Sequence, residues 1–318
     1  MHLNSWLLAL LICGSTAFRL AAHEGPEHEI EIINEKIKVS GESAELLADR
    51  AIEYRLLAKL PEAIKDLERA VVLDPESMAI HRALADALYE NGKADDALST
   101  ISRGLRGNAD EPSDVAALRI LRAEILRSKK DYGKALEDAN AALELHNANP
   151  EWYVVRSDIQ RRMKAHKERL AGIEAGIKAT GAWILELERV EALIDAGNLD
   201  VALPIIEAQL EDSRIKSSWL IRRARVRQAQ GKQDEAVEDL KAALVEIGTR
   251  LNPKAPDLPL LLDKARALEM LGDTRDALSA YKTARDKGAG DSLKDKIKAL
   301  EESTSKPAPP DAPDPKAQ

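Results

Sequence analysis

The sequence predicts an all-α protein built from repeated pairs of helices, and two observations carry this prediction. Alanine, leucine, glutamate, lysine and arginine dominate a chain of 318 residues that is 32% charged and only 3% aromatic, a composition typical of helices. A pattern of small and aliphatic residues also recurs along the chain. Its lead residues follow one another at steps of 34, 38, 34, 33, 34 and 41 positions: Ala63, Ala97, Ala135, Arg169, Ala202, Ala236 and Ala277.

The first element, residues 1–22, has the pattern of a secretory signal peptide. Its apolar run from Trp6 to Phe18 is too short for a comfortable membrane span, and small residues follow it. We expect cleavage after Ala17 or after Ala22, which would export the chain to the periplasm or the medium. An uncleaved leader would instead anchor the chain in a membrane. The only cysteine, Cys13, lies in this leader, so a mature chain would have no thiol for a disulfide or for catalysis.

Residues 23–43 are predicted to contain a helix that caps the N-terminal end of the array. Ile30, Ile33 and Ile37 form an apolar stripe at helical spacing. Pro26 suits the first turn of this helix, and the glutamates beside it suit the positive end of the helix dipole. The segment therefore reads as a single second helix placed before the first complete pair.

Each repeat is predicted to hold two helices that cross where their side chains are small. The lead residues above mark the second helix, and small residues at a crossing let two backbones approach closely. Turn glycines separate the helices in the segments ENGKADDA, DAGNLDVA, AQGKQDEA and MLGDTRDA. The first helix is marked twelve positions earlier by Ala51, Ala85, Ala123, Ser157, Val190, Ala224 and Ala265.

A helix-turn-helix unit of about 34 residues with this alternation resembles the tetratricopeptide repeat (TPR) family. The best-matching unit contains Ala51, Tyr54, Ala63, Leu67, Ala70 and Pro75. The resemblance covers about residues 28–302 and implies a right-handed α-solenoid of about seven TPR units with helical caps at both ends. The array would span residues 44–288, with units that start near 44, 78, 116, 150, 183, 217 and 258.

The segments around and after the array have their own predicted roles. Residues 289–302 carry apolar positions at helical spacing between charged residues, as the capping helix of a solenoid requires. Residues 303–318 are rich in proline and are expected to be a disordered tail. The two longest steps of the repeat fall in residues 107–113 and 248–257, which we predict to be turns that absorb insertions.

An arginine and an aspartate recur together and support this register. Arg50, Arg122 and Arg223 occupy one position on the first helix of three units, just before the small residue of the crossing. In each of these units an aspartate follows sixteen residues later, at positions 66, 138 and 239. We expect an ion pair that braces the two helices of the unit rather than a binding site.

No motif of an enzyme or of a cofactor site is present. The sequence lacks a P-loop, a G-x-G-x-x-G and a G-x-S-x-G, and its histidines are scattered over different units. The net charge of −8 argues against a nucleic-acid binder, which would carry an excess of basic residues. We therefore predict no enzymatic activity, no cofactor and no nucleic-acid partner.

The resemblance implies a scaffold that binds another protein or a peptide. In the TPR family the first helix of each unit lines a concave groove, and partners bind there. Two basic stretches, residues 161–169 and 222–227, could contact an acidic partner. The sequence does not determine the oligomeric state. The family's groove positions fall on Arg82, Asp86, Tyr89, Glu124, Arg127, Asp158, Arg161, Arg162, Glu191, Arg225, Arg266 and Glu269.

An alternative hypothesis is metal binding or metal delivery by the N-terminal segment. His23, Glu24 and His28 resemble an H-E-x-x-H zinc motif, but the histidines are five residues apart rather than four, so on a helix they would diverge. Cleavage after Ala22 would leave His23 as the first residue, whose amine and imidazole could bind a copper-like ion with His28 nearby. Cleavage after Ala17 would remove this possibility.

Overall fold

The computed structural model describes residues 25–107, 112–252 and 254–305, and these residues form helices α1–α16 without a strand. The all-α prediction is confirmed. The chain divides into two compact units, Met1–His146 (unit 1) and Asn147–Gln318 (unit 2). The predicted leader, His23 and residues 306–318 of the predicted tail lie outside the described residues. Among the described helices, none is both long and apolar enough to cross a membrane.

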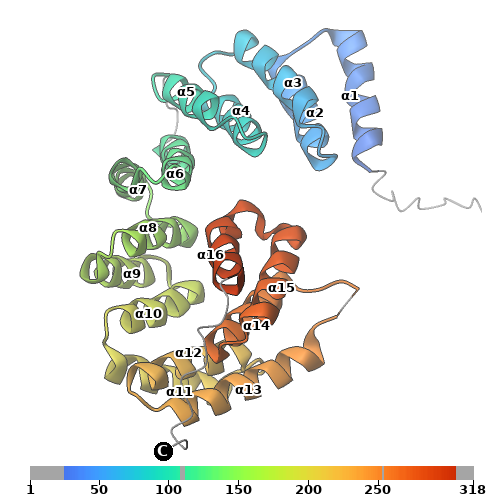
Figure 1. Cartoon of the computed structure of the whole chain (residues 1–318). Coiled ribbons are helices and arrows are strands. Elements are labelled where there is room, and N and C mark those ends of the chain that lie inside the picture. Colours follow the sequence, from blue (N-terminus) through green and yellow to red (C-terminus); the bar gives the residue numbers. More distant parts are fainter. Residues whose placement is uncertain (1–24, 108–111, 253, 306–318) are drawn as a thin grey trace, which may run out of the picture. The chain divides into compact units, whose positions relative to one another are not determined.

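Unit 1 is a stack of antiparallel helices in which each helix packs on its neighbours in the sequence (Figure 1). The helix α1 stands before three complete pairs, α2 with α3, α4 with α5, and α6 with α7. Their bounds are α1 Pro26–Ser40, α2 Ala44–Leu56, α3 Leu60–Leu73, α4 Met78–Glu90, α5 Ala94–Gly104, α6 Pro112–Ser128 and α7 Tyr132–Leu145.

Unit 2 continues the same alternation with four pairs and a final helix. The pairs are α8 with α9, α10 with α11, α12 with α13, and α14 with α15. Two short helical turns, η1 (Arg285–Ala289) and η2 (Gly290–Leu293), lead into α16, and Gly288 and Gly290 supply the positive φ of that bend. The bounds are α8 Pro150–Arg162, α9 His166–Thr180, α10 Trp183–Asp195, α11 Leu199–Asp212, α12 Ser217–Ala229, α13 Gln233–Arg250, α14 Leu258–Leu271, α15 Thr274–Ala284 and α16 Lys294–Ser305.

The turn between the two helices of every pair contains one residue with left-handed backbone. Four of these turns use glycine, which adopts a positive φ without steric cost. In the other three, Ala58, Lys130 and Lys164 take the same conformation at φ of 57°, 65° and 58°. The seven residues recur with the same steps as the lead residues: Ala58, Gly92, Lys130, Lys164, Gly197, Gly231 and Gly272. The turn geometry therefore repeats even where the glycine of the sequence pattern is missing.

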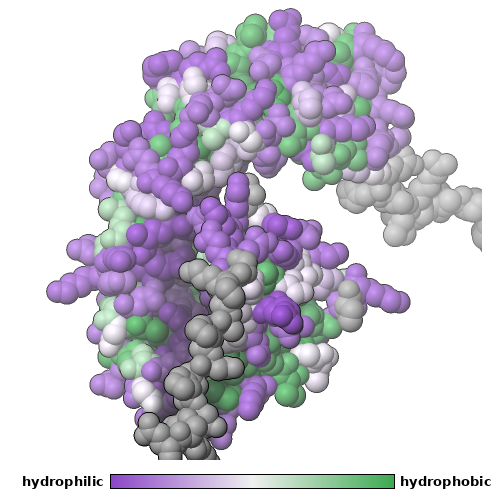
Figure 2. Space-filling view, in the orientation of Figure 1, coloured by the Kyte–Doolittle hydropathy of each residue, from purple (hydrophilic) through white to green (hydrophobic). Residues whose placement is uncertain are grey.

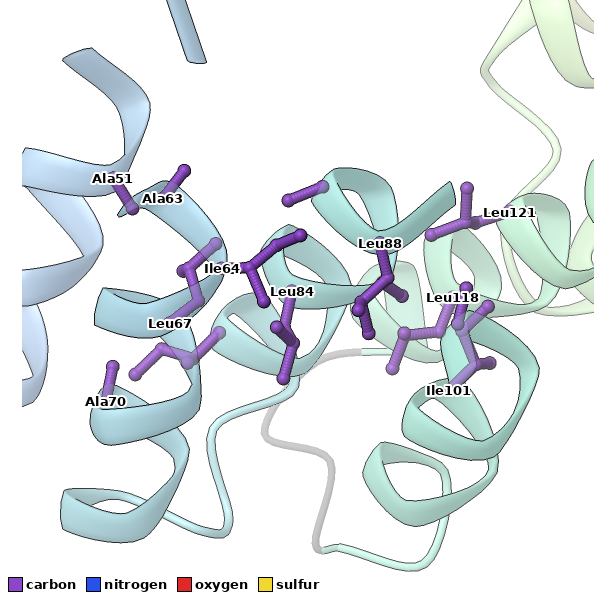
Figure 3. Close-up of a cluster of buried hydrophobic side chains, with 14 of the residues drawn as sticks. Ala51, Ala63, Ile64, Leu67, Ala70, Leu84, Leu88, Ile101, Leu118 and Leu121 are labelled. Carbon is purple, nitrogen blue, oxygen red and sulfur yellow. The ribbon is translucent and has the colours of Figure 1, made fainter. Parts of the chain in front are cut away.

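The core runs between the helices of successive pairs, as the small-residue pattern predicts. In unit 1, Ala51, Ala63, Leu67 and Ala70 are buried together with leucines and isoleucines of α4, α5 and α6 (Figure 3). The close crossings depend on the small side chains. A Cβ at Gly104 would lie 2.8 Å from the ring of the buried His81, so this position has no room for alanine unless His81 shifts.

The predicted helix braces are confirmed. Arg50 donates two hydrogen bonds to Asp66, both of 2.7 Å. Arg122 binds Asp138 in the same way at 2.5 and 2.6 Å, and Arg223 binds Asp239 at 3.0 and 2.6 Å. The three aspartates are buried, so each bidentate pair satisfies a carboxylate that has left water. The ion pairs hold the two helices of a repeat together.

Arg156 occupies the same position in the α8–α9 pair, where no aspartate follows. Its Nη2 donates to the backbone carbonyl oxygen of Gly172, sixteen residues later, at 3.0 Å. Burial, with no carboxylate opposite, lowers the pKa of the guanidinium. A Cβ at residue 172 would lie 2.8 Å from Nη2 of Arg156, the movable end of a flexible side chain. An aspartate at position 172 would therefore give Arg156 the carboxylate partner that the other three arginines have.

We expect Gly172→Asp to stabilise the protein more than Gly172→Asn does, by about 0.5–1 kcal/mol in the free energy of unfolding. The two side chains have nearly the same shape and helix propensity, so the difference isolates the ion pair with Arg156. Urea unfolding at low and high salt measures it, and the difference should shrink at high salt. Equal stability of the two variants at low salt would show that Arg156 does not form the pair.

The segment 248–257 was predicted to be a turn, but α13 continues through Gly248 and ends at Arg250, so part of the insertion lengthens a helix. Gly248 is exposed and Thr249 donates to the backbone carbonyl of Glu246, both compatible with a last helical turn.

At the N-terminal end of unit 1, α1 begins at Pro26 with Glu27 and Glu29 in its first turn, as predicted.

Candidate protein-binding face

The first helices of consecutive pairs lie side by side in each unit and form what we call the first-helix face. In unit 1 it consists of α2, α4 and α6, and in unit 2 of α8, α10, α12 and α14. The predicted groove residues all belong to these helices. Hydrophilic side chains predominate on the surface of both units in the view of Figure 2. The two units differ in how many of the predicted groove residues form ion pairs with other residues of the same unit.

In unit 2, the predicted residues Glu191 and Arg225 belong to an ion-pair network between α10 and α12. Glu191 is bound by Arg222 at 2.9 Å and by Arg225. Arg225 also donates to Asp195 at 2.8 Å. Burial alone would raise the pKa of the Glu191 carboxyl, but Arg222 and Arg225 hold it below its ordinary value. The Glu191 carboxylate therefore stays charged, and arginines of the same unit bind both Glu191 and Asp195.

Arg169 extends the same network into the crossing of α8 and α9, and its side chain is only 2% exposed. Its Nη1 donates to Asp195 at 2.6 Å and its Nη2 to Glu188 at 3.1 Å. Its Nε donates to the hydroxyl of Ser157 at 2.8 Å, and this hydroxyl donates to Glu188 at 3.1 Å. Arg169 is thus a buried cation with three polar partners: Asp195, Glu188 and Ser157.

The remaining predicted residues of unit 2 are paired within or next to their own helices. Asp158 is bound by Arg161 and, at 2.9 Å, by Arg162, and these cations hold its pKa well below the usual range although burial acts in the opposite direction. Arg266 lies 3.5 Å from Asp263. Glu269 accepts hydrogen bonds from Tyr281 of α15 at 2.9 Å and from Lys296 of α16 at 2.7 Å.

The interpretation that residues 222–227 could contact an acidic partner gains no support from these ion pairs. All four arginines of that stretch are ion-paired inside unit 2: Arg222, Arg223, Arg225 and Arg227. In the stretch 161–169, Arg161, Arg162 and Arg169 are likewise paired. Sequence alone shows the positive charges but not the carboxylates that the neighbouring helices bring to them.

In unit 1, the predicted residues are less completely paired. Asp86 lies half-buried on α4, and no described residue donates a hydrogen bond to it. Burial raises the pKa of its carboxyl, and this effect outweighs the opposing influence of Arg55 and Arg82. Arg82 is exposed and forms no ion pair with a described residue. Tyr89 is half-buried, and Glu124 and Arg127 lie half-buried on α6, where neither lacks an interaction partner.

Two aliphatic residues of α2 complete this part of the face, and the predicted site did not include them. Ile52 is 51% exposed and Leu56 68% exposed, one turn apart. Ile52 holds the same position in its repeat as Asp86 does in the next, which is the sequence signal that could have found it. Arg55, between them in the sequence, binds Glu90 of α4 at 2.6 and 3.1 Å and so ties α2 to α4.

The alternative metal site gains no support from the described residues. His28 lies half-buried on α1, and His23 lies outside the described residues. No group of three or more histidine, cysteine, aspartate or glutamate side chains within residues 25–107, 112–252 and 254–305 is arranged to hold a metal ion.

Comparison with known proteins agrees with this architecture. The tetratricopeptide repeat family model matches residues 57–120. The small glutamine-rich tetratricopeptide repeat-containing protein 2 of Saccharomyces cerevisiae is 28% identical over 130 residues, which are 41% of this chain, and the chain spans only 34% of the length of that relative.

A solved tetratricopeptide repeat structure shares the fold at low sequence identity. A tetratricopeptide repeat protein from Parabacteroides merdae superposes with a TM-score of 0.60 at 17% identity, over 81% of this chain and 98% of that one. YrrB, described as a TPR protein with an unusual peptide-binding site, gives a TM-score of 0.47 at 16% identity, over 68% of this chain and 97% of that one. The match to the tetratricopeptide repeat model therefore covers residues 57–120, and the chain has the α-solenoid fold of TPR proteins.

Proposed function

We propose that this chain is a non-enzymatic, exported TPR scaffold that binds another protein through the first-helix face of unit 1. TPR proteins bind peptides or proteins, and the fold supports the same role here. The observation that favours unit 1 is the exposure of Ile52 and Leu56 beside the incompletely paired Asp86. In unit 2 the corresponding polar residues are occupied by one another.

Export is the part of this proposal that rests on the sequence alone. The apolar run and the small residues of the leader support it. Mass spectrometry of the purified protein should find a new N-terminus after Ala17 or Ala22 in the periplasmic or secreted fraction. An intact N-terminus in a membrane fraction would contradict cleavage and show that the leader anchors the chain in a membrane.

The double variant Ile52→Ser with Leu56→Ser should lose most captured partner while staying folded, because exposed side chains contribute little to stability. The wild-type chain is used as bait in the exported fraction, with chemical cross-linking, and the captured proteins are quantified. The chain offers a matched control: Val72 and Val201 are 68% and 51% exposed, equal to Leu56 and Ile52, but lie on the second helices α3 and α11.

The two double variants give opposite outcomes if the face is assigned correctly. The variant of Val72 and Val201 should retain the partner, and the variant of Ile52 and Leu56 should lose it. If both retain the same partner, the first-helix face of unit 1 is not the binding surface.

A further inference from the structure

Asp86 is a carboxylate that its own protein leaves incompletely compensated. It lies half-buried on α4, within electrostatic range of Arg55, Arg82 and Glu90, yet no described residue gives it a hydrogen bond. A carboxylate that is partly removed from water gains most from a hydrogen bond or a cation at close range. The group is therefore suited to receive a donor from outside the chain.

The two nearby arginines do not fill this role. The Nε and Nη2 of Arg55 donate to Glu90 at 3.1 and 2.6 Å, in a bidentate pair that joins α2 to α4. Arg82 is on α4 itself, one turn before Asp86, and remains exposed without an ion pair to a described residue. Asp86 therefore differs from Glu191 in unit 2, which Arg222 and Arg225 bind directly.

Two exposed aliphatic side chains lie on α2, the neighbouring first helix to the one that carries Asp86. Ile52 occupies on α2 the position that Asp86 occupies on α4, and Leu56 follows one turn later. Arg55 bridges from this turn of α2 to Glu90, one turn after Asp86, so the turns of α2 and α4 that carry the exposed aliphatic side chains and the carboxylate are neighbours. A ligand that covers both turns would meet the aliphatic side chains and an anionic group together.

From this arrangement we infer that the face binds a segment that carries a lysine or arginine beside an aliphatic residue. The cation pairs with Asp86, and the aliphatic side chain packs on Ile52 and Leu56. This inference rests on the proposed function and adds the chemistry of the partner. It is the opposite of a groove that grips an acidic segment, because the cations that could do so in unit 2 are bound to carboxylates of the chain itself.

A selection of random peptides of twelve residues, displayed on phage, tests the inference with the full chain as target. Wild type and Asp86→Asn are used in parallel, and the control target is Asp95→Asn, an exposed carboxylate on the second helix α5 that pairs with Lys129. We expect wild type and the control to select peptides in which lysine or arginine neighbours leucine, isoleucine or valine. Asp86→Asn should lose that basic enrichment.

The selected peptide is then synthesised, and its affinity is measured by calorimetry. Its affinity should fall about tenfold or more on Asp86→Asn, and similarly when its basic residue is replaced by norleucine, as expected for loss of one close ion pair. Ile52→Ser with Leu56→Ser should weaken the same peptide, which places it on this face.

The possible failures separate the inference from the proposed function. Peptides that are acidic or neutral, or that bind Asp86→Asn as tightly as wild type, while still requiring Ile52 and Leu56, would overturn the cationic partner and leave the binding face in place. If the selected peptides ignore Ile52, Leu56 and Asp86 alike, or if no peptide is selected, both proposals fail.

Discussion

Arg169→Ala is expected to lower the free energy of unfolding of unit 2 by about 3–5 kcal/mol. The repeat pattern places alanine at this position in most units, so sequence comparison between repeats would treat the substitution as harmless. The structure predicts the opposite, because Glu188, Asp195 and Ser157 all receive hydrogen bonds from this one guanidinium. Removing it leaves Glu188 without its cation and Asp195 with Arg225 as its remaining arginine partner.

Tryptophan fluorescence during urea unfolding measures this loss. Three of the four tryptophans, Trp152, Trp183 and Trp219, belong to unit 2, so the signal follows mainly that unit. Arg189→Ala is the matched control, because Arg189 lies on α10 in the same unit and makes only longer ion pairs, of 3.4 and 3.9 Å. It should cost less than about 1 kcal/mol. A cost for Arg169→Ala no larger than this would mean that the buried network contributes nothing to stability.

Arg225→Glu is expected to destabilise unit 2 by at least about 3 kcal/mol, rather than to act on partner binding alone. The substitution would place a third carboxylate against Glu191 and Asp195, which Arg225 now bridges. Like charges at this distance repel strongly where burial limits solvent screening. Arg225 was a predicted groove residue, so charge reversal there is the obvious test from sequence, and its result would be misread without the structure.

Arg161→Glu is the control for Arg225→Glu, because it reverses a charge on the predicted groove without breaking an ion pair between helices. Arg161 is another predicted groove residue, and its side chain is exposed and pairs only with Asp158 of its own helix. Reversing it should change the midpoint of unfolding little, since Arg162 still binds Asp158. The same fluorescence unfolding experiment measures both variants. If the two lose similar amounts of stability, the bridge between α10 and α12 is not a stabilising element.

The predictability of the candidate site differs between the units for a physical reason. The family's groove positions correctly fell on the first helices, because helix phase follows from the repeat register. Register says nothing about which charge on one helix meets which charge on the next. Glu188 and Asp195 are not in the predicted set, although they bind Arg169, and Ile52 and Leu56 are absent because their exposure depends on what α4 leaves uncovered.

Some departures from the repeat were visible in the sequence without being interpretable there. Ser157 and Arg169 replace small apolar residues in one and the same unit, and the structure shows that they replace an apolar crossing by a polar one. Lys130 and Lys164 stand where other units have a turn glycine, and the backbone still takes the left-handed conformation. In both cases the surrounding residues determine the local structure: the polar partners at the crossing and the backbone conformation of the turn.

Residue spacing along the chain is enough to predict the all-α fold, the pairing of helices into repeats, the small residues at each crossing and the three arginine–aspartate braces. These features follow from short-range spacing, since the two helices of a pair are joined by a short turn and meet at fixed offsets. Which polar groups remain available for a partner depends on the folded arrangement of the helices. That depends on contacts between side chains more than 30 residues apart, as between Arg55 and Glu90 or between Arg225 and Glu191. The charges of unit 2 neutralise one another across α10 and α12, whereas Asp86 in unit 1 is left without a hydrogen bond from a described residue, beside two exposed aliphatic side chains.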